Sequence, residues 1–173
     1  GALSAAWGAQ AEFVAVNVAG TRAVLAGCRA HGVARLVHIS SPAVIFDGGD
    51  HVDADESWPY ARRFSSTYAL TKRLAESLVN AAPDVPSFIL RPKAIFGPGD
   101  RALLPRLLAA ARQGRLRCFG DGANLVDLTY VENVVHAVNL ALTAPNAGGR
   151  TYFITNGEHV ALWPVITHLL AAL

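Results

Sequence analysis

The sequence predicts an α/β protein in which helices cover both faces of a doubly wound, mostly parallel β-sheet. Short apolar runs, typical of buried strands, alternate along the chain with longer stretches of helical periodicity. Of the 173 residues, 52% are hydrophobic and 16% are charged, as is typical of a sheet that is buried on both faces. The crossovers between parallel strands are expected to be right-handed.

The chain opens with a predicted loop over residues 1–8 and a helix over about 10–30, which ends at Gly32. The run 36–39 is apolar and contains β-branched residues, which predicts a buried strand. Residues 42–65 then form a long connection containing several prolines and glycines. Loops of this length inside compact domains are usually functional or mobile.

The remaining elements continue the alternation. Helices are predicted at about 67–81, 102–113 and 131–142 and from 162 onward, because apolar residues recur there with helical spacing. Strands are predicted at 87–90, 116–119, 126–130 and 151–154, where short apolar runs are bounded by proline, glycine or polar residues.

Tyr68 and Lys72 are the most informative residues. Four positions apart on the helix 67–81, they lie on one face, and Ser41 follows the strand 36–39 closely. Carbonyl reduction requires a proton donor at the oxygen, and an ammonium about 4 Å from a phenol stabilises the phenolate by roughly 4 kcal/mol at an effective dielectric of about 20. Ser41 would hold the reacting oxygen beside the phenol. The set indicates hydride-transfer chemistry.

The same spacing has a plainer interpretation. A tyrosine packed on the core beside a solvated lysine is the commoner meaning of Tyr-x-x-x-Lys. The order of strand, Ser40-Ser41, long loop and helix favours the catalytic interpretation here. His38 and Ser40 do not indicate a hydrolase, because no third group is in place to orient the histidine.

Composition excludes several function classes. The net charge is +2, and the densest basic cluster, Arg112, Arg115 and Arg117, is expected to be a solvated helix end, so no nucleic-acid partner is predicted. The histidines and acidic residues lack ligand spacing, so no metal is expected. Cys28 and Cys118 are expected to be small buried residues in a reducing compartment.

No signal peptide or membrane span is expected. The chain start has no basic segment followed by an apolar core, and the apolar run Val160–Leu173 is too short to span a bilayer and contains Pro164 and His168. These features predict a soluble, cytoplasmic protein.

The chain resembles the extended short-chain dehydrogenases/reductases of the 3β-hydroxysteroid dehydrogenase type. The resemblance covers essentially all of the chain as an ordered set of motifs. They are Asn17-Val18-Ala19-Gly20-Thr21, the segment from His38 to Gly48, Asp55-Glu56-Ser57, Tyr68-Ala69-Leu70-Thr71-Lys72 with Ala75-Glu76, the segment from Leu90 to Asp100, Gly120-Asp121-Gly122, Val126-Asp127 and Tyr130-Val131. Further similarities around Trp7, Leu104 and Tyr152 indicate the branch that acts on 2-alkyl-3-oxoacids, which shares much with its sterol-acting relatives.

The resemblance implies a role for each matching residue. Tyr68 would exchange the proton, Lys72 would assist it and hold the nicotinamide ribose, and Ser41 would bind the reacting oxygen. NAD or NADP is the implied cofactor, and the substrate would be apolar. The residues implied to contact the cofactor are Ser40, Tyr68, Lys72, Pro92, Ala94 and Ile95. Asn17 would be either a helix residue near the site or a helix-bending polar residue. A homodimer through the helices at 10–30 and 67–82 is also implied.

The resemblance is to part of a Rossmann-like fold. Residues 1–95 would be the C-terminal half of a dinucleotide-binding domain, and 96–173 would mix substrate-binding segments with a returning strand and helices. The family's phosphate-binding glycine loop is missing. Gly97-Pro98-Gly99-Asp100-Arg101-Ala102 fits G-x-G-x-x-A formally, but Pro98 has no N–H to offer a phosphate. We therefore expect these 173 residues alone to bind cofactor weakly and to be inactive.

Two other functions remain open. One is a sugar-nucleotide epimerase or dehydratase on the same scaffold. Such relatives typically carry an arginine before the aspartate of the short strand to clamp a diphosphate, whereas Val126 precedes Asp127 here. The other is a non-catalytic fragment or cofactor-sensing relative, which would be expected to have lost part of the Ser41, Tyr68 and Lys72 set.

Overall fold

The computed structural model describes residues 2–5, 7–118, 120–145 and 149–172. The chain forms two compact units, one made of Gly1–Arg91 and Ala137–Phe153 and the other of Pro92–His136 and Ile154–Leu173. The expected division into cofactor-binding and substrate-binding parts at residue 95 stays a prediction.

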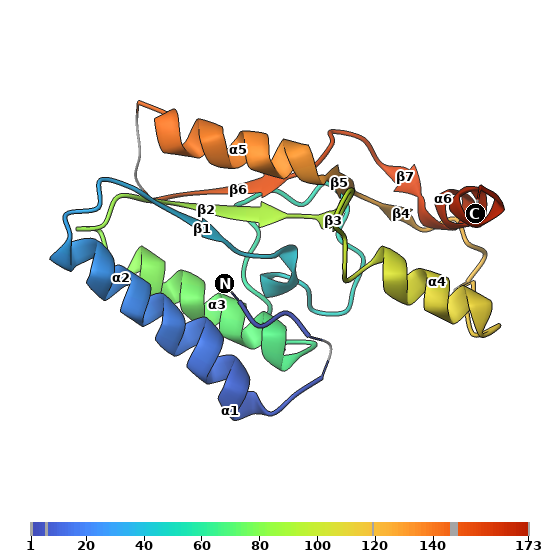
Figure 1. The fold of residues 1–173 in the computed structure, drawn as a ribbon, viewed down its shortest axis with the longest axis horizontal. Helices are drawn as coiled ribbons and strands as arrows, with labels where there is room; N and C mark the ends of the chain where they lie inside the picture. Colours follow the sequence, from blue (N-terminus) through green and yellow to red (C-terminus); the bar gives the residue numbers. More distant parts are fainter. Residues whose placement is uncertain (1, 6, 119, 146–148, 173) are drawn as a thin grey trace. The chain divides into compact units, whose positions relative to one another are not determined.

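The first unit is built on a three-stranded sheet in the order β1 (Leu36–Ile39), β2 (Ser87–Pro92) and β6 (Arg150–Ile154) (Figure 1). β1 and β2 are parallel, with Val37 opposite Phe88. Every residue of β2 is buried, although Arg91-Pro92 had been expected to stop the strand. The prediction of a parallel α/β sheet is confirmed.

Helices lie on both sides of this sheet (Figure 1). One side carries α1 (Gln10–Phe13), a π-helical segment η1 (Val14–Ala19), α2 (Gly20–Ala30) and α3 (Thr67–Asn80). The end of α5 (Val131–Thr143) lies on the other. The predicted helix over 10–30 is therefore confirmed in extent, but its middle part, Val14–Ala19, is π-helical and not α-helical. α3 starts where predicted because Ser66 Oγ accepts a hydrogen bond from the N–H of Ala69.

The second unit contains two short sheets. β3 (Ala94–Phe96) runs parallel to β5 (Leu128–Tyr130), and β4 (Leu125–Val126) runs antiparallel to β7 (Val160–Ala161). The prediction of one strand over 126–130 is wrong, because the chain changes sheet at Asp127. The carboxylate there is held by Lys93 and His159.

This unit contains the helices α4 (Leu104–Arg112) and α6 (Leu162–Ala171) and the first half of α5. α4 starts at Leu104 and not Ala102, because the Asp100 carboxylate accepts the N–H groups of residues 102–104 and caps the helix. The strand predicted over 116–119 is wrong for 116–118, where the flanking arginines are exposed and no described strand pairs with the run. Phe119 lies outside the described residues.

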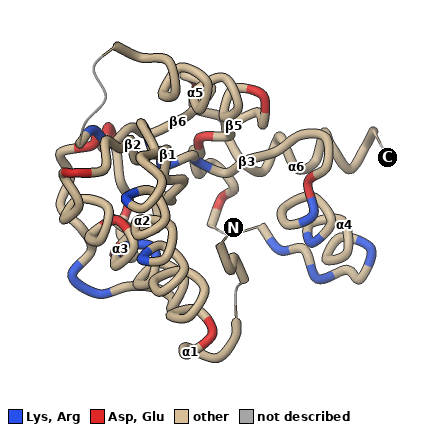
Figure 2. The backbone as a smooth tube through the Cα atoms, turned by 60° about the vertical axis from the view of Figure 1, so that its left-hand side comes forward, with Lys and Arg blue, Asp and Glu red and all other residues tan. Residues whose placement is uncertain are grey.

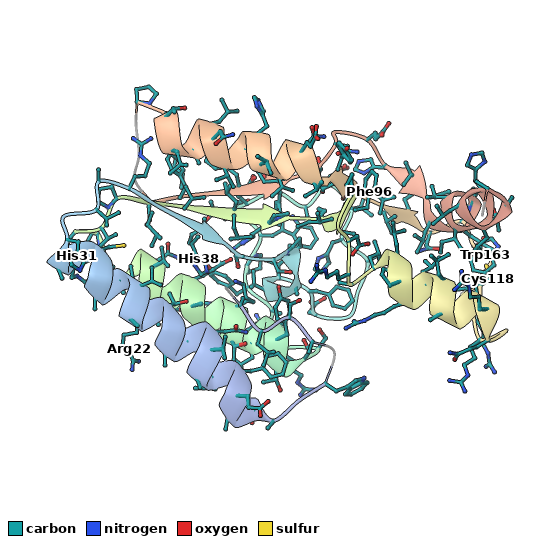
Figure 3. All side chains as sticks on the ribbon, in the orientation of Figure 1. Arg22, His31, His38, Phe96, Cys118 and Trp163 are labelled. Carbon is teal, nitrogen blue, oxygen red and sulfur yellow. The ribbon has the colours of Figure 1, made fainter. Side chains whose placement is uncertain are left out.

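The loop after α4 packs closely against α6. A Cβ added to Gly122, which has φ +76°, would meet Cys118 Sγ at 2.8 Å and Trp163 Cβ at 3.1 Å, and Cys118 and Trp163 are labelled together in Figure 3. Cys28 is buried as expected, but Cys118 is exposed, and neither forms a disulfide among the described residues. Lys and Arg gather around α4 and the following turn (Figure 2), where Arg112 and its neighbours are exposed as expected.

One helical run, Gln10–Ala30, is long and apolar enough to cross a bilayer by length and composition, and 22% of its most apolar window is buried. A core helix of a soluble protein passes the same test, so this run is weak evidence for a membrane span. It includes the buried amide of Asn17, which hydrogen-bonds within the first unit.

Candidate active site

Tyr68 and Lys72 open onto one cavity in the first unit. The cavity has a volume of about 930 Å³ and lies among the start of the chain, α2, β1 and α3. Ser40 and His38 line it from β1 and the residue after it. The helical spacing that predicted a shared face for the phenol and the ammonium is thus matched by a shared cavity.

The position of Lys72 is fixed by one short contact. Its side chain is 3% exposed, and Nζ donates a hydrogen bond of 2.5 Å to the carbonyl oxygen of Ile39. Burial lowers the pKa of the Lys72 ammonium, and the charge of Glu76 partly opposes that shift. Two of the three ammonium protons remain free for other acceptors near the end of β1.

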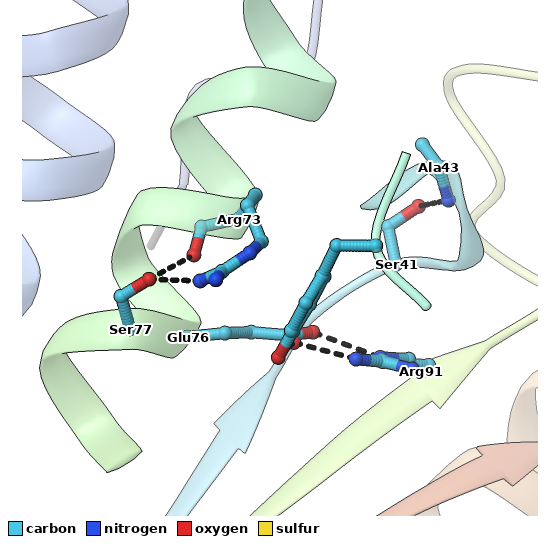
Figure 4. Close-up of polar contacts among 7 residues, drawn as sticks. Ser41, Ala43, Arg73, Glu76, Ser77 and Arg91 are labelled. Atoms are coloured by element: carbon cyan, nitrogen blue, oxygen red, sulfur yellow. Dashed lines mark hydrogen bonds and ion pairs between the residues drawn. The ribbon is translucent and has the colours of Figure 1, made fainter. Parts of the chain in front are cut away.

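The two serines after β1 have different surroundings. Ser40 is buried and lines the cavity. Ser41 is half-buried, is not among the lining residues, and caps a 3₁₀ turn, η2 (Pro42–Val44): its Oγ accepts a hydrogen bond of 3.2 Å from the N–H of Ala43 (Figure 4). Because Ser41 Oγ accepts in that contact, its hydroxyl proton is free to donate to a substrate oxygen.

Asn17 connects three segments at the wall of the cavity. It is buried within η1. Its amide accepts from the N–H of Leu3 at 2.8 Å, donates to the carbonyl of Leu3 at 3.1 Å, and donates to Thr71 Oγ1 at 3.1 Å. Asn17 thus lines the cavity and lies where the helix departs from α-helical geometry, and its part in a functional site stays a prediction.

A buried ion pair lies one turn beyond Lys72. Arg91 Nε and Nη2 donate to the two carboxylate oxygens of Glu76 at 3.0 and 2.7 Å, and the hydroxyl of Tyr60 donates to Glu76 at 2.7 Å (Figure 4). We did not predict this network from the sequence. The sequence does carry a signal for it. Glu76 follows Lys72 by four residues and Arg91 ends an apolar strand, so two opposite charges fall on faces that are expected to be buried.

The surroundings of His38 favour its neutral form. Burial, and then the charge of Lys72, lowers the pKa of His38 to about 4. Its Nε2 is buried and has no hydrogen-bond partner among the described residues. His38 lies on the face of β1 that packs against α2 and α3, and it is labelled there in Figure 3.

The segment Gly97–Ala102, which formally fits G-x-G-x-x-A, is held by local packing and hydrogen bonds. A Cβ on Gly97, which has φ +136°, would meet Val131 Cγ1 at 2.8 Å, so glycine is required there by packing. The N–H groups at the start of α4 are already bound by Asp100. A phosphate therefore finds neither the open backbone nor the free donors that this motif normally offers.

The second unit brings together Lys93, Asp127 and His159. Lys93 Nζ lies 3.2 Å and His159 Nδ1 2.7 Å from the Asp127 carboxylate. Ala94 and Ile95, in β3, are exposed, and Pro92 ends β2; their expected contact with the nicotinamide stays a prediction. Among the described residues, no group of His, Cys, Asp or Glu is placed to hold a metal ion.

The comparisons with known proteins decide the family. Residues 4–173 match the model of the 3-beta hydroxysteroid dehydrogenase/isomerase family. The chain belongs to this family. It is 45% identical to the 2-alkyl-3-oxoalkanoate reductase of Stenotrophomonas maltophilia, over 99% of this chain and 54% of that protein. It is 41% identical to the mouse sterol-4-alpha-carboxylate 3-dehydrogenase, over 93% of this chain and 47% of that protein.

Solved structures give the same fold. The dTDP-glucose 4,6-dehydratase DesIV of Streptomyces venezuelae, solved with NAD and TYD, superposes with a TM-score of 0.83 at 26% identity, covering 99% of this chain and 55% of that one. The UDP-glucuronic acid 4-epimerase of Bacillus cereus, in complex with NAD, gives 0.84 at 26% identity, covering 99% and 57%. The predicted partial Rossmann-like fold is confirmed. The chain spans about half the length of the curated relatives it matches.

Proposed function

We propose that this chain is part of an NAD(P)-dependent oxidoreductase that interconverts a 3-oxo and a 3-hydroxy group on an apolar substrate, either a 2-alkyl-3-oxoacid or a sterol-like molecule. The observation that carries the proposal is that Tyr68 and Lys72 share one cavity with the end of β1. Relatives named as a 2-alkyl-3-oxoalkanoate reductase and a sterol dehydrogenase support the substrate class.

The residues present fit the nicotinamide–ribose half of the cofactor. A cavity of about 930 Å³ is within the range of small-molecule sites, and Lys72 has N–H donors left over for ribose hydroxyls. Ser40, Pro92, Ala94 and Ile95 are the further residues proposed to contact it. Among the described residues, no glycine-rich loop offers the free donors that a diphosphate requires. When bound, the cofactor supplies or accepts the hydride.

The chain's own residues handle the proton. In reduction, the Tyr68 hydroxyl gives its proton to the carbonyl oxygen as the carbon gains hydride, and the Lys72 ammonium stabilises the resulting phenolate. Ser41 donates its hydroxyl proton to the same oxygen and orients it toward Tyr68. In oxidation, Tyr68 takes the proton back.

A sugar-nucleotide epimerase or dehydratase is the second candidate. It is favoured by the fold of DesIV and the Bacillus cereus epimerase. Against it, Val126 occupies the position before Asp127 and pairs with Val160 in the β4–β7 sheet. An apolar side chain there cannot clamp a diphosphate.

One assay separates the candidates. The full-length protein is supplied with NADH or NADPH and a 2-alkyl-3-oxoalkanoate, and separately with NAD and dTDP-glucose or UDP-glucuronic acid. We expect cofactor oxidation with the oxoacid and no conversion of the sugar nucleotides. Turnover of a sugar nucleotide alone would reverse the assignment. Turnover of neither, with cofactor bound, would favour the non-catalytic candidate.

Two further expectations belong to the proposal. We propose a homodimer through the helices at 10–30 and 67–82, which present exposed apolar side chains such as Val14 and Leu74. We also propose a cytoplasmic location, because Cys28 and Cys118 form no disulfide among the described residues, as is usual in a reducing compartment. Light scattering after gel filtration tests the first, and fractionation of cells tests the second.

A further inference from the structure

The carboxylate of Glu76 is fully buried and has no part in the chemistry proposed above. Its side chain is 0% exposed. It nevertheless accepts hydrogen bonds from two nitrogens of Arg91 and from the hydroxyl of Tyr60. Burying an ionised carboxylate this deep in a protein is costly unless the carboxylate is well paired. The hydrogen bonds from Arg91 and Tyr60 provide that pairing for Glu76.

These contacts join three segments, of which only α3 also lines the cavity. Glu76 is in α3, one helical turn after Lys72. Arg91 is in β2, beside the strand whose end carries Ser40 and Ser41. Tyr60 is in the long connection that follows Ser41, and the Arg73 guanidinium stacks on its ring with 3.6 Å between the guanidinium carbon and the ring centroid.

We propose that Glu76 is a positioning residue for Lys72. Its ionised carboxylate holds α3 on β2 so that Lys72 Nζ reaches the carbonyl of Ile39, and its negative charge keeps Lys72 in the ammonium form at working pH. The catalytic part of this inference rests on the proposed function, whereas the charge coupling between Glu76 and Lys72 is independent of it.

The charges around the pair support this role. Burial lowers the pKa of Lys72 and Glu76 raises it. Burial raises the pKa of Glu76 itself, but the interactions of its carboxylate with Arg91, Ser40 and Tyr60 outweigh that effect and leave the pKa below its usual value. The group facing Lys72 from β1 is His38, which is neutral. Glu76 is therefore the one anion in this set, opposite two buried cations, Lys72 and Arg91.

The experiment measures Lys72 directly. The sequence contains two lysines, Lys72 and Lys93, so a chain labelled with ¹³C at lysine Cε gives two resonances. The resonance that disappears in the Lys93→Arg variant belongs to Lys93, and the other belongs to Lys72. Each resonance is followed against pH. In Glu76→Gln, which keeps the side-chain shape and removes the charge, we expect the Lys72 midpoint to fall by about one pH unit, the size typical of one neighbouring charge. The Lys93 midpoint serves as the internal reference.

Two further variants keep the result decisive. Tyr60→Phe removes one hydrogen bond to Glu76 and no charge, so the Lys72 midpoint should stay in place. Glu76→Gln combined with Arg91→Met removes both charges of the pair. It replaces Glu76→Gln if the single variant does not fold, and it should show a smaller fall, because removing the positive charge of Arg91 acts on Lys72 in the opposite direction.

The catalytic consequence is read in the full-length protein. In Glu76→Gln the alkaline limb of the kcat–pH profile should move to lower pH, with kcat about tenfold lower above both midpoints and KM unchanged. A Lys72 midpoint that stays in place in the charge-removing variants, or that moves equally in Tyr60→Phe, overturns the proposal. A midpoint that moves while Lys72→Met retains full turnover upholds the charge coupling and overturns the proposed function.

Discussion

The ammonium of Lys72 in α3 donates a hydrogen bond of 2.5 Å to the backbone carbonyl of Ile39, at the end of β1. This contact joins the helix that carries Tyr68 to the strand end that carries Ser40 and Ser41. The geometry of the proposed site therefore depends on one side chain reaching one main-chain oxygen.

Replacing Lys72 with methionine should abolish turnover and weaken NAD(P) binding. Methionine keeps the length and apolar stem of lysine but cannot donate to Ile39 or to ribose hydroxyls. We expect kcat to fall at least about a hundredfold, the usual range for loss of an acid–base partner, with a higher cofactor Kd by calorimetry. Lys93→Met is the matched control from the second unit. Unchanged turnover in Lys72→Met would contradict the proposed mechanism.

Replacing Tyr68 with phenylalanine separates chemistry from binding. The variant loses only the hydroxyl, so the proton donor disappears while the ring remains. Turnover should fall by about two to four orders of magnitude, with little loss of cofactor binding. Tyr152→Phe, in β6, is the control. Near-normal turnover in Tyr68→Phe would remove Tyr68 from the mechanism.

Much of the first unit could be predicted from sequence, because its signals are local. The spacing of Tyr68 and Lys72 is set by helix geometry, and the apolar run 87–90 predicts a buried strand. The interruption of the 10–30 helix could not be predicted, because it accompanies contacts of Asn17 with Leu3 and Thr71 that are distant in sequence.

The second unit was predicted less well for the same reason. β4 and β7 are two residues long each, too short to leave a pattern of alternation. The chain changes sheet at Asp127, whose partners Lys93 and His159 come from segments about 30 residues away on either side. Likewise, the sequence pattern places Glu76 and Arg91 on buried faces, but only the fold shows that they pair with each other.

His38 should make stability depend on pH. Its folded pKa of about 4 lies below the ordinary value of 6.5, so the unfolded chain binds the proton more readily between these values. The stabilisation is therefore fully present above pH 6.5 and is lost as pH falls toward 4. By pH 4.5 the loss is about 2 to 3 kcal/mol.

Urea unfolding at pH 7 and pH 4.5 measures this effect. His38→Gln should lose less stability between the two pH values than the unsubstituted chain, because glutamine does not titrate. His31→Gln, at the exposed end of α2, should behave like the unsubstituted chain. If His38→Gln and the unsubstituted chain lose the same amount, His38 is not the group responsible.

Asn17→Leu should destabilise the first unit. Leucine has the same branching and the same number of side-chain heavy atoms, but it is bulkier and removes the bonds to Leu3 and Thr71, and it leaves the N–H of Leu3 without its acceptor. The expected cost is about 2 to 3 kcal/mol in the free energy of unfolding. Asn139→Leu, on the exposed face of α5, is the control and should change stability by less than about 0.5 kcal/mol. Equal effects of the two substitutions would show that the Asn17 contacts contribute nothing specific.

The 173-residue chain alone should bind NAD(P) weakly. Its cavity offers Lys72 for the ribose, but Asp100 already occupies the N–H groups at the start of α4, and Pro98 has no N–H. Without main-chain donors for the diphosphate, the most highly charged part of the cofactor stays unpaired. Calorimetry with NAD and NADP should show no saturable binding at millimolar ligand, whereas the full-length protein should bind. Asp100→Ala is the control, because it frees the N–H groups at the start of α4. If these groups can bind phosphate, this variant gains affinity for NAD and NADP. Tight binding by the unsubstituted chain would instead show that it contains a phosphate site elsewhere.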